Sequence, residues 1–384
     1  MAKNDLAITD VKAYPISFPL PAENRISVGI GTVLKRDVVI VKVITAGGLV
    51  GWGESYHARA HTAVAKIIEA TLRPLILGME ATDVVGVWER IYRYQLVGYG
   101  MGAGCSIAMS GIDLALWDIR GQVAGMPIYQ LLGGSRKGLP AYAGGVALGY
   151  MEPAKLVEEV QSLVAAGYQA VKLKVGETPK RDIARIRAVR EALSSELVLL
   201  TDANTAYTLD DARAVMPAMD ELGVGWLEEP FPAPDYPAYK LARSFGRTPL
   251  AAGENYYTRF EFNRLLEDGA VRIWQPDLSK IGGITEGLRI AAIASANKVP
   301  IHAHSSMAGV NQAATIHFLA AIENAGYFEA DVSKSNKFRD ELVSKPWEVD
   351  KNGHVWPLDK PGLGVEVDEE FLAEHPPIEG LTHK

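Results

Sequence analysis

Two lysines, Lys172 and Lys174, alternate with apolar residues in the stretch 170–176. A run of this kind is typical of a buried parallel strand, on which alternate side chains share a face, so both ammonium groups should point the same way. Neighbouring positive charges disfavour each other's protonation, and we expect the pKa of at least one lysine to fall toward neutrality. Such a lysine is a candidate base for removing a proton, although a strand with one solvated face fits the same pattern.

Polar residues follow Lys174 at intervals of 23 to 28 residues, and each one ends an apolar stretch. They are Asp202, Glu228, Glu254, Asp277, His304 and Glu329. Each interval has the length of one strand, one helix and their loops. In a barrel of alternating strands and helices, polar residues at the carboxyl ends of the strands form the active site. The spacing therefore predicts that these side chains surround the mouth of one barrel.

Three of these residues, Asp202, Glu228 and Glu254, would end successive strands and bring three carboxylates together. At an effective dielectric of about 20, each pair of charges about 4 Å apart costs roughly 4 kcal/mol, so the trio requires a cation. An all-oxygen set suits a hard ion, and we expect Mg²⁺, with Mn²⁺ as the alternative; zinc prefers cysteine and histidine. For any one acid alone, a helix cap or a surface charge is the alternative interpretation.

A second acid–base group is expected opposite Lys174, where Asp277 and His304 would lie on adjacent strands. The carboxylate would orient the imidazole and raise its basicity, although a structural, hydrogen-bonded histidine is the alternative for His304 and for His302. A divalent ion between two opposed bases suits removal of the proton α to a carboxylate, because the ion neutralises charge on the enediolate oxygens. Glu329, if protonated, could donate a hydrogen bond to the same oxygens.

The elements that must position these residues fall into three parts of the chain. Residues 1–135 combine strands at 38–45 and 49–54 with helical periodicity near 63–77, 84–94 and 106–124, which is typical of an α+β domain. Between 136 and 335 eight strands alternate with seven helices, expected near 153–166, 178–193, 209–222, 235–244, 259–268, 284–297 and 311–325. We therefore expect an α/β barrel, a (β/α)7β modified TIM barrel, with an α+β capping domain that residues 336–384 complete.

The composition narrows the class of protein. The chain has 384 residues, 48% of them hydrophobic, which is enough for more than one domain. Its net charge of −7 with mixed signs argues against nucleic acid as a partner, and it lacks an apolar run of the roughly 20 residues needed to span a membrane. The start of the sequence shows no signal peptide, and the single cysteine, Cys105, suits a packing role in a reducing cytoplasm. A cytoplasmic protein with a small-molecule partner is expected.

The motifs, taken in order, resemble the enolase superfamily and in particular its mandelate racemase-like subgroup. The resemblance covers essentially the whole chain and includes GWGE at 51–54, GIDLALWD at 111–118, KLK at 172–174, DAN at 202–204, EEP at 228–230, GEN at 253–255, QPD at 275–277, GG at 282–283 and PGLG at 361–364. Enolase-superfamily sites are a known case of lysine or histidine bases combined with Mg²⁺. The resemblance thus implies the roles given above, with Lys172 as the neighbour that lowers the pKa of Lys174.

The resemblance also implies that loops of the cap set substrate specificity, here near 19–33 and 56–61. The candidate substrate contacts are Asn204 in the barrel and Arg25, Tyr56, His57 and Tyr99 in the cap. Relatives of this kind commonly form dimers to octamers, so we expect a homo-oligomer.

The leading hypothesis is a Mg²⁺-dependent dehydratase acting on an aldonic or aldaric sugar acid. Lys174 or His304 would take the α-proton, and His304 would assist loss of the β-hydroxyl, giving a 2-keto-3-deoxy acid. The preference over racemisation comes from the family alone, because two bases on opposite faces serve an epimerase equally well. Cycloisomerisation of a lactone uses the same intermediate, and a non-catalytic metal-binding scaffold is the remaining alternative.

Overall fold

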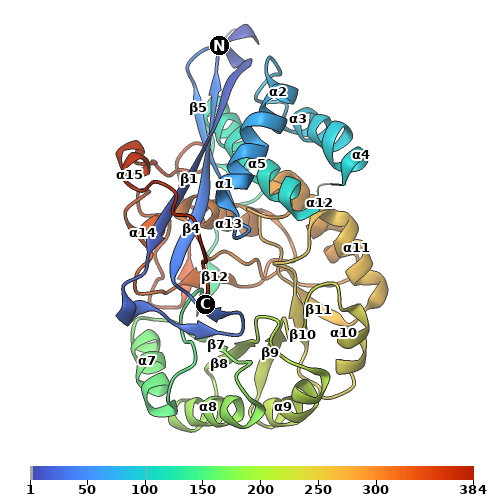
Figure 1. Ribbon diagram of the computed structural model, residues 1–384, viewed down its shortest axis with the longest axis vertical. Helices are drawn as coiled ribbons and strands as arrows, with labels where there is room; N and C mark the ends of the chain where they lie inside the picture. The colour runs from blue at the N-terminus through green and yellow to red at the C-terminus, as the bar shows by residue number, and fades with distance from the viewer. Residues whose placement is uncertain (1–2, 101) are drawn as a thin grey trace.

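The cap is built on a three-stranded antiparallel sheet in the order β1-β4-β5, in the upper part of Figure 1. The computed structural model describes residues 3–100 and 102–384, and the three strands are β1 (Ile8–Pro19), β4 (Lys35–Thr45) and β5 (Val50–Ser55). The sequence pattern predicts β4 and β5 but not β1. Buried and exposed residues do not alternate cleanly along β1, which is held by pairing with β4 along most of its length.

Helices cover the cap sheet, and the longest of them, α5 (Gly102–Ala124), lies directly against β5. The contact is very close, because a Cβ atom added to Gly53 would lie 1.9 Å from the carbonyl oxygen of Gly111. This approach explains the glycines that the sequence places in both segments. The other cap helices are α1 (His61–Lys66), η3 (Ile67–Leu72), α2 (Arg73–Ile76), α3 (Val84–Ile91), η4 (Tyr92–Leu96), α4 (Val97–Tyr99) and, at the end of this part, α6 (Ile128–Leu131).

Below the cap, a parallel sheet curls in the order β11-β10-β9-β8-β7-β6-β12. Its strands are β6 (Leu139–Gly144), β7 (Ala170–Lys174), β8 (Val198–Asp202), β9 (Val224–Glu228), β10 (Leu250–Ala252), β11 (Val271–Trp274) and β12 (Phe328–Asp331). Seven helices alternate with them: α7 (Pro153–Ala165), α8 (Pro179–Ala192), α9 (Leu209–Glu221), α10 (Tyr236–Ala242), α11 (Thr258–Asp268), α12 (Gly283–Ala296) and α13 (Gly309–Ala321). The predicted modified TIM barrel with an N-terminal cap is therefore confirmed.

The strand expected near 299–304 is much shorter than the others. It is reduced to Ile301, which forms parallel bridges to Trp274 on one side and to Ala325 on the other. Because Pro300 has no N–H to donate, the segment has fewer ladder hydrogen bonds available. This short link lies between β11 and β12 and closes the ring of strands.

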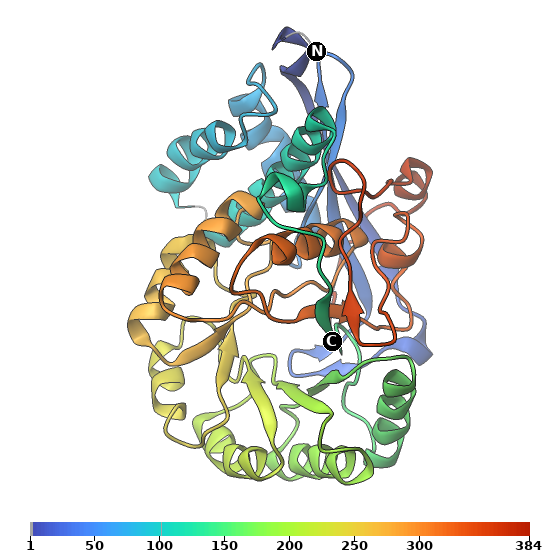
Figure 2. The same cartoon turned by 180° about the vertical axis from the view of Figure 1, so that it is seen from behind.

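The C-terminal part of the chain runs from the barrel back to the cap. β13 (His354–Val355) pairs with β6, while α15 (Glu369–Glu374) reaches β4, where Lys42 Nζ lies 2.6 Å from Glu369 Oε1. The end of the chain lies between cap and barrel in both views (Figures 1 and 2). Smaller elements complete the fold: η1 (Lys3–Leu6), η2 (Ala22–Asn24), β2 (Ser27–Val28), β3 (Gly31–Thr32) and α14 (Lys337–Asp340). The domain boundaries at 135 and 335 stay a prediction.

No helix in the described part of the chain is both long enough and apolar enough to cross a membrane.

Candidate active site

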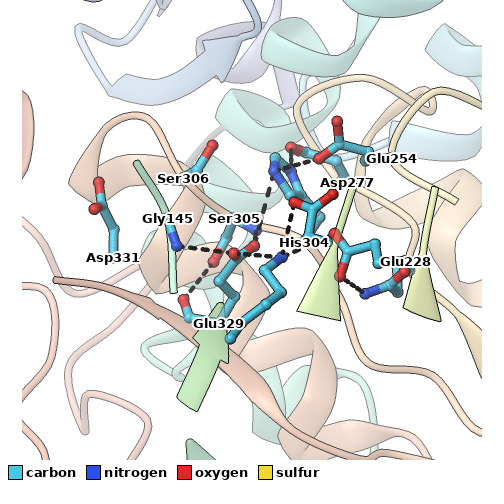
Figure 3. A network of polar contacts seen from close by, with 12 residues as sticks. Gly145, Glu228, Glu254, Asp277, His304, Ser305, Ser306, Glu329 and Asp331 are labelled. Atoms are coloured by element: carbon cyan, nitrogen blue, oxygen red, sulfur yellow. Dashed lines mark hydrogen bonds and ion pairs between the residues drawn. The ribbon is translucent and has the colours of Figure 1, made fainter. Parts of the chain in front are cut away.

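The predicted polar residues lie at the carboxyl ends of the barrel strands. Lys174, Asp202 and Glu228 are the last residues of β7, β8 and β9, and the strand register pairs Lys174 with Asp202 and Asp202 with Glu228. The others follow the next strands or lie in the last one: Glu254 after β10, Asp277 after β11, His304 after Ile301, and Glu329 in β12. Figure 3 shows five of these residues, Glu228, Glu254, Asp277, His304 and Glu329, around one network of polar contacts.

The two lysines share one face of β7, as predicted, because both ammonium groups approach Asp202. Asp202 Oδ2 lies 2.5 Å from Lys174 Nζ and 3.8 Å from Lys172 Nζ. Lys174 is 7% exposed and Lys172 only 1%, so Lys174 is the lysine nearer to the open side of the site.

Lys172 is surrounded by acceptors, which set its pKa. Its Nζ lies 2.8 Å from Glu228 Oε1, 2.9 Å from Glu329 Oε1 and 3.3 Å from the hydroxyl of Tyr142. Burial lowers the pKa of Lys172, but the charges of Glu228 and Glu329 raise it by more than burial lowers it. The pKa of Lys172 is therefore well above its usual value. The fall predicted for at least one lysine of the pair therefore does not occur at Lys172, because its carboxylate contacts outweigh its burial. The role of Lys172 as the neighbour that tunes Lys174 stays a prediction.

The His304 imidazole is fixed at both nitrogens. Nδ1 lies 2.6 Å from Asp277 Oδ2, and Nε2 lies 2.6 Å from Glu254 Oε2. Asp277 is oriented in turn, since its Oδ1 accepts hydrogen bonds from Ser279 N at 2.8 Å and from Asn311 Nδ2 at 3.0 Å. Burial lowers the pKa of His304, but the neighbouring carboxylates, Glu254 above all, raise it to about 10. The expected pairing of His304 with Asp277 is present.

Glu329 acts as a hydrogen-bond acceptor in this structure. Its Oε1 accepts from Gly145 N at 2.9 Å and its Oε2 from Ser305 N at 3.2 Å, while Lys172 and His304 lie close by. Burial raises the pKa of Glu329, but the charges of Lys172 and His304 lower it to about 2. The predicted role as hydrogen-bond donor requires a protonated carboxyl, and it stays a prediction.

The three carboxylates predicted to bind metal are each paired with a different cation. Asp202 contacts Lys174, Glu228 contacts Lys172, and Glu254 contacts His304. Within residues 3–100 and 102–384, the side chains of His, Cys, Asp and Glu form no group of three or more placed to hold a metal ion. The ligand set is therefore not assembled in this arrangement, and the role of these three carboxylates as metal ligands stays a prediction.

The chemistry of the donor set nevertheless fits a hard cation. Burial raises the pKa of Glu228, Lys172 opposes the rise, and repulsion by Asp202, Glu329 and Glu254 adds to it, giving a pKa of about 7. A divalent cation would relieve this repulsion, and carboxylate oxygens are the ligands that Mg²⁺ prefers.

The backbone is strained immediately after two of these carboxylates. Asn204, Thr205 and Glu229 have φ angles of 42°, 65° and 37°, in the left-handed region that residues other than glycine rarely adopt. Such residues cost about 1–3 kcal/mol each and cluster at functional sites. The turn brings Asn204 N to 2.8 Å from Asp202 Oδ1, so the strain helps to orient this carboxylate.

A cavity with about 610 Å³ of empty space, part of it open to solvent, lies between the barrel mouth and the cap. Its barrel side is lined by Gly145, Val146, Lys174, Asn204, Glu254, His304, Ser306, Met307 and Glu329. Its cap side, called the roof below, is lined by Val28, Ile30, Val33, Lys35, Arg36, Tyr56, His57, Thr382 and His383. The structure thus brings three predicted substrate contacts, Asn204, Tyr56 and His57, to this cavity; their role in binding stays a prediction.

Two other predicted contacts do not line this cavity. Arg25 lines a separate pocket, and its Nε donates a hydrogen bond to Leu20 O at 3.1 Å. From the same loop, Val28 and Val33 line the cavity instead. Tyr99 lies on α4 and is 78% exposed. Both expectations relied on loop positions that the sequence does not encode.

Two residues near the site, Lys280 and His383, were missed by sequence reasoning. Lys280 is buried 3.8 Å from Glu254 Oε1 and 4.0 Å from the ring centre of Tyr56, and its place three residues after Asp277 is a signal that could have found it. His383 carries no comparable signal, since it comes from the C-terminal segment.

Two groups that the sequence left open have structural roles. His302 Nδ1 accepts from Tyr327 N at 2.9 Å and its ring lies 5.0 Å from that of Trp226, so this histidine is part of the packing. Cys105 is buried, and burial raises the pKa of its thiol to about 12, as suits a packing role.

Comparison with models of known protein families shows to which family the chain belongs. Residues 10–133 match the model of the mandelate racemase / muconate lactonizing enzyme N-terminal domain, and residues 155–371 match the enolase C-terminal domain-like model. The chain belongs to the mandelate racemase-like subgroup of the enolase superfamily. The resemblance found in the sequence motifs is therefore confirmed.

Relatives within this family include enzymes of two kinds. Arabinonate dehydratase of Saccharolobus solfataricus is 32% identical over 96% of this chain and 99% of its own length. D-galactarolactone cycloisomerase of Agrobacterium fabrum is 34% identical over 88% of this chain and 91% of its own length. The named relatives are thus hydro-lyases and isomerases.

Solved structures similar to this chain include members of the same superfamily. An enolase superfamily member from Polaromonas sp. JS666 is 52% identical, with a TM-score of 0.95 over 97% of this chain and 98% of its own. A racemase from Streptomyces coelicolor, solved with bound magnesium, is 29% identical, with a TM-score of 0.87 over 96% of this chain and 99% of its own.

Proposed function

We propose that this protein is a Mg²⁺-dependent hydro-lyase that dehydrates a sugar acid to a 2-keto-3-deoxy acid. The observation that carries the proposal is that Lys174 and His304 line one cavity together with the carboxylates of Glu254 and Glu329, while Asp277 holds the His304 ring from behind. An amine and an imidazole at one cavity can act on the same substrate carbon, provided that they lie within hydrogen-bond reach of its proton.

Asp202, Glu228 and Glu254 would hold Mg²⁺, with Mn²⁺ as the alternative ion. When bound, the ion supplies positive charge next to the substrate carboxylate, whose oxygens gain negative charge as the α-proton leaves. Support comes from the carboxylate-rich donor set and from the Streptomyces relative that contains magnesium.

The chain's own residues would carry the protons. Lys174 or His304 takes the α-proton, the electron pair of the broken C–H bond forms the enediolate, and the β C–O bond then breaks. His304, held by Asp277, donates a proton to the departing hydroxyl, which leaves as water. The resulting enol gains a proton at C3 to give the 2-keto-3-deoxy acid. Lys172 and Glu329 would keep these groups in position through their ion pair.

The named relatives favour dehydration, since arabinonate dehydratase matches nearly the whole chain. Cycloisomerisation of a sugar-acid lactone is the second candidate, supported by the relative from Agrobacterium fabrum. Epimerisation needs no groups beyond the same two bases.

The experiment is incubation with Mg²⁺ and a panel of aldonic and aldaric acids and their lactones in D₂O. A 2-keto product formed from an acid with loss of water identifies a dehydratase. A 2-keto product that is an isomer of a lactone substrate, with no water lost, identifies a cycloisomerase, and α-deuterium without a keto product identifies an epimerase. Lys174→Ala and His304→Asn should each abolish product formation, while the surface variant Lys240→Ala serves as the matched control. Full activity in both site variants would refute the two-base arrangement, and no reaction with any acid would refute the proposed function.

We further propose that the enzyme works in the cytoplasm as a homo-oligomer on a small carboxylate, with 1–135 and 336–384 as the cap and 136–335 as the barrel. The exposed apolar side chains Val97 and Leu241 are compatible with a subunit contact. Sedimentation analysis at micromolar concentration would contradict the oligomer if it gave the mass of one chain.

A further inference from the structure

The segment 378–384 forms part of the roof above the barrel mouth. Backbone hydrogen bonds join Lys384 N to Thr32 O at 3.0 Å, Thr32 N to Lys384 O at 2.7 Å and Leu34 N to Thr382 O at 2.9 Å. The hydroxyl of Thr382 donates to Asp37 Oδ2 at 2.8 Å. The segment is thus fixed like a short added strand beside 32–34, and both views place it at the junction of cap and barrel (Figures 1 and 2).

This pairing places His383 in the cavity wall with an unsatisfied nitrogen. The ring lines the same cavity as Lys174 and His304, and its Nδ1 is buried without a hydrogen-bond partner among the described residues. Asn204 Oδ1, on the barrel side of the cavity, is buried and unpartnered in the same sense. Buried polar atoms without partners are rare in folded proteins, and a ligand with hydroxyl groups could satisfy both.

The roof presents paired charges. Lys35 Nζ lies 3.0 Å from Asp37 Oδ1, and Arg36 Nη1 lies 3.3 Å from Asp331 Oδ2. Because these cations already have carboxylate partners, neither is free to neutralise a second carboxylate on a ligand.

The two imidazoles of the roof, His57 and His383, have pKa values below their usual range. His57 Nδ1 accepts from Arg59 N at 2.9 Å, so a neutral ring carries its proton on Nε2. Burial and the charge of Lys280 hold the pKa of His57 well below its usual value, and burial with the charge of Arg59 lowers the pKa of His383 to about 4. Arg59 itself is exposed and does not line the cavity.

We infer that His383 is a specificity-determining residue that hydrogen-bonds a distal hydroxyl of the substrate, and that the preferred substrates are aldonic rather than aldaric acids. The inference rests on the proposed function, because a substrate carboxylate held at the barrel mouth leaves the far end of the molecule at the roof. An aldonic acid ends in a neutral hydroxyl, which suits this surface; an aldaric acid ends in a second carboxylate, which would lose its hydration without gaining a free cation.

The test separates the far end of the substrate from its reacting end. Initial rates with Mg²⁺ are measured for D-galactonate, for the matching diacid galactarate, and for glycerate, which has an α-proton and a β-hydroxyl but no further carbons. His383→Phe keeps a planar ring and removes both nitrogens, and His383→Asn keeps a donor and an acceptor. His375→Asn is the matched control, since that ring stacks on Phe371 at 3.8 Å and does not line the cavity.

We expect the wild type to favour galactonate over galactarate, and His383→Phe to raise KM for galactonate about three- to tenfold, the value of one lost hydrogen bond. His383→Asn should recover part of this loss, and KM for glycerate should not change in any variant. An equal loss for glycerate, an unchanged KM for galactonate, or a wild type that prefers galactarate would each overturn the inference.

The same comparison can be made by calorimetric binding of the three acids to the Mg²⁺-loaded protein. If no acid is converted, the proposed function fails, but binding still decides the role of His383. The inference is supported if His383→Phe weakens the binding of galactonate, compared with wild type, by more than it weakens the binding of glycerate. It is contradicted if the affinities for the two acids change by the same factor or do not change.

Discussion

Replacing Asp277 by Asn tests whether this carboxylate controls the chemistry of His304. Asn keeps the size of the side chain but removes the charge 2.6 Å from His304 Nδ1. The contacts of the other oxygen with Ser279 and Asn311 can persist, so the change isolates the partnership with the imidazole.

The expected magnitude follows from the geometry. A buried hydrogen bond to a charged group contributes about 1.5–3 kcal/mol, which corresponds to a rate loss of roughly 10- to 150-fold if the bond is needed in the transition state. The pKa of His304 should also fall, because Asp277 is one of the groups that raise it to about 10, after Glu254 and Glu329. A group whose pKa is raised on folding adds stability below its unfolded pKa, and this is lost as the pH rises toward 10. Asp277→Asn should therefore flatten the pH dependence of unfolding between about pH 6.5 and 10.

The assay is the rate of α-deuterium exchange together with NMR titration of His304 and denaturant unfolding from pH 6 to 10. Asp118→Asn is the matched control, because Asp118 is also a buried carboxylate, which accepts from Leu363 N at 2.9 Å in the cap, away from His304. An exchange rate and a His304 titration equal to wild type in Asp277→Asn would refute the reasoning. So would equal losses in the two variants, since these would indicate a general effect of neutralising a buried acid.

Three further predictions concern stability and metal. Lys172→Met should lower the free energy of unfolding by about 3–5 kcal/mol, because Glu228 and Glu329 lose a buried cation; urea unfolding measures this, and a loss below about 1 kcal/mol would contradict it. Glu54 accepts hydrogen bonds from Ala308 N and Asn311 N, and burial raises its pKa to about 8. The free energy of unfolding should therefore fall as the pH rises from about 4.5 to 8, and Glu54→Gln should remove most of this fall. A pH profile of stability that is the same in Glu54→Gln as in wild type would contradict this prediction. Mg²⁺ at about 100 times its Kd should add about 2.7 kcal/mol of stability in thermal melts, and Glu228→Gln should abolish the shift; a shift retained in full would exclude Glu228 as a ligand.

The sequence by itself determined the alternation of strands and helices and the order of the polar residues along it. All seven barrel helices have their predicted places, because turn residues bound each helix and most of them have a local amphipathic pattern; α13 is an exception, since nearly all of its residues are buried. The pairing of Asp277 with His304 was equally predictable, since the carboxyl ends of neighbouring parallel strands meet at one edge. The motifs also identified the family, because their order along the chain is a property of the sequence alone.

Only the tertiary structure decided what depends on distant segments. β1 exists through its pairing with β4, and the pKa of Lys172 is set by Glu228 and Glu329, which come from other strands. His383 reaches the cavity by pairing with 32–34, more than 300 positions earlier in the chain. Such contacts are fixed by the free energy of packing the whole chain, and no local spacing of residues encodes them.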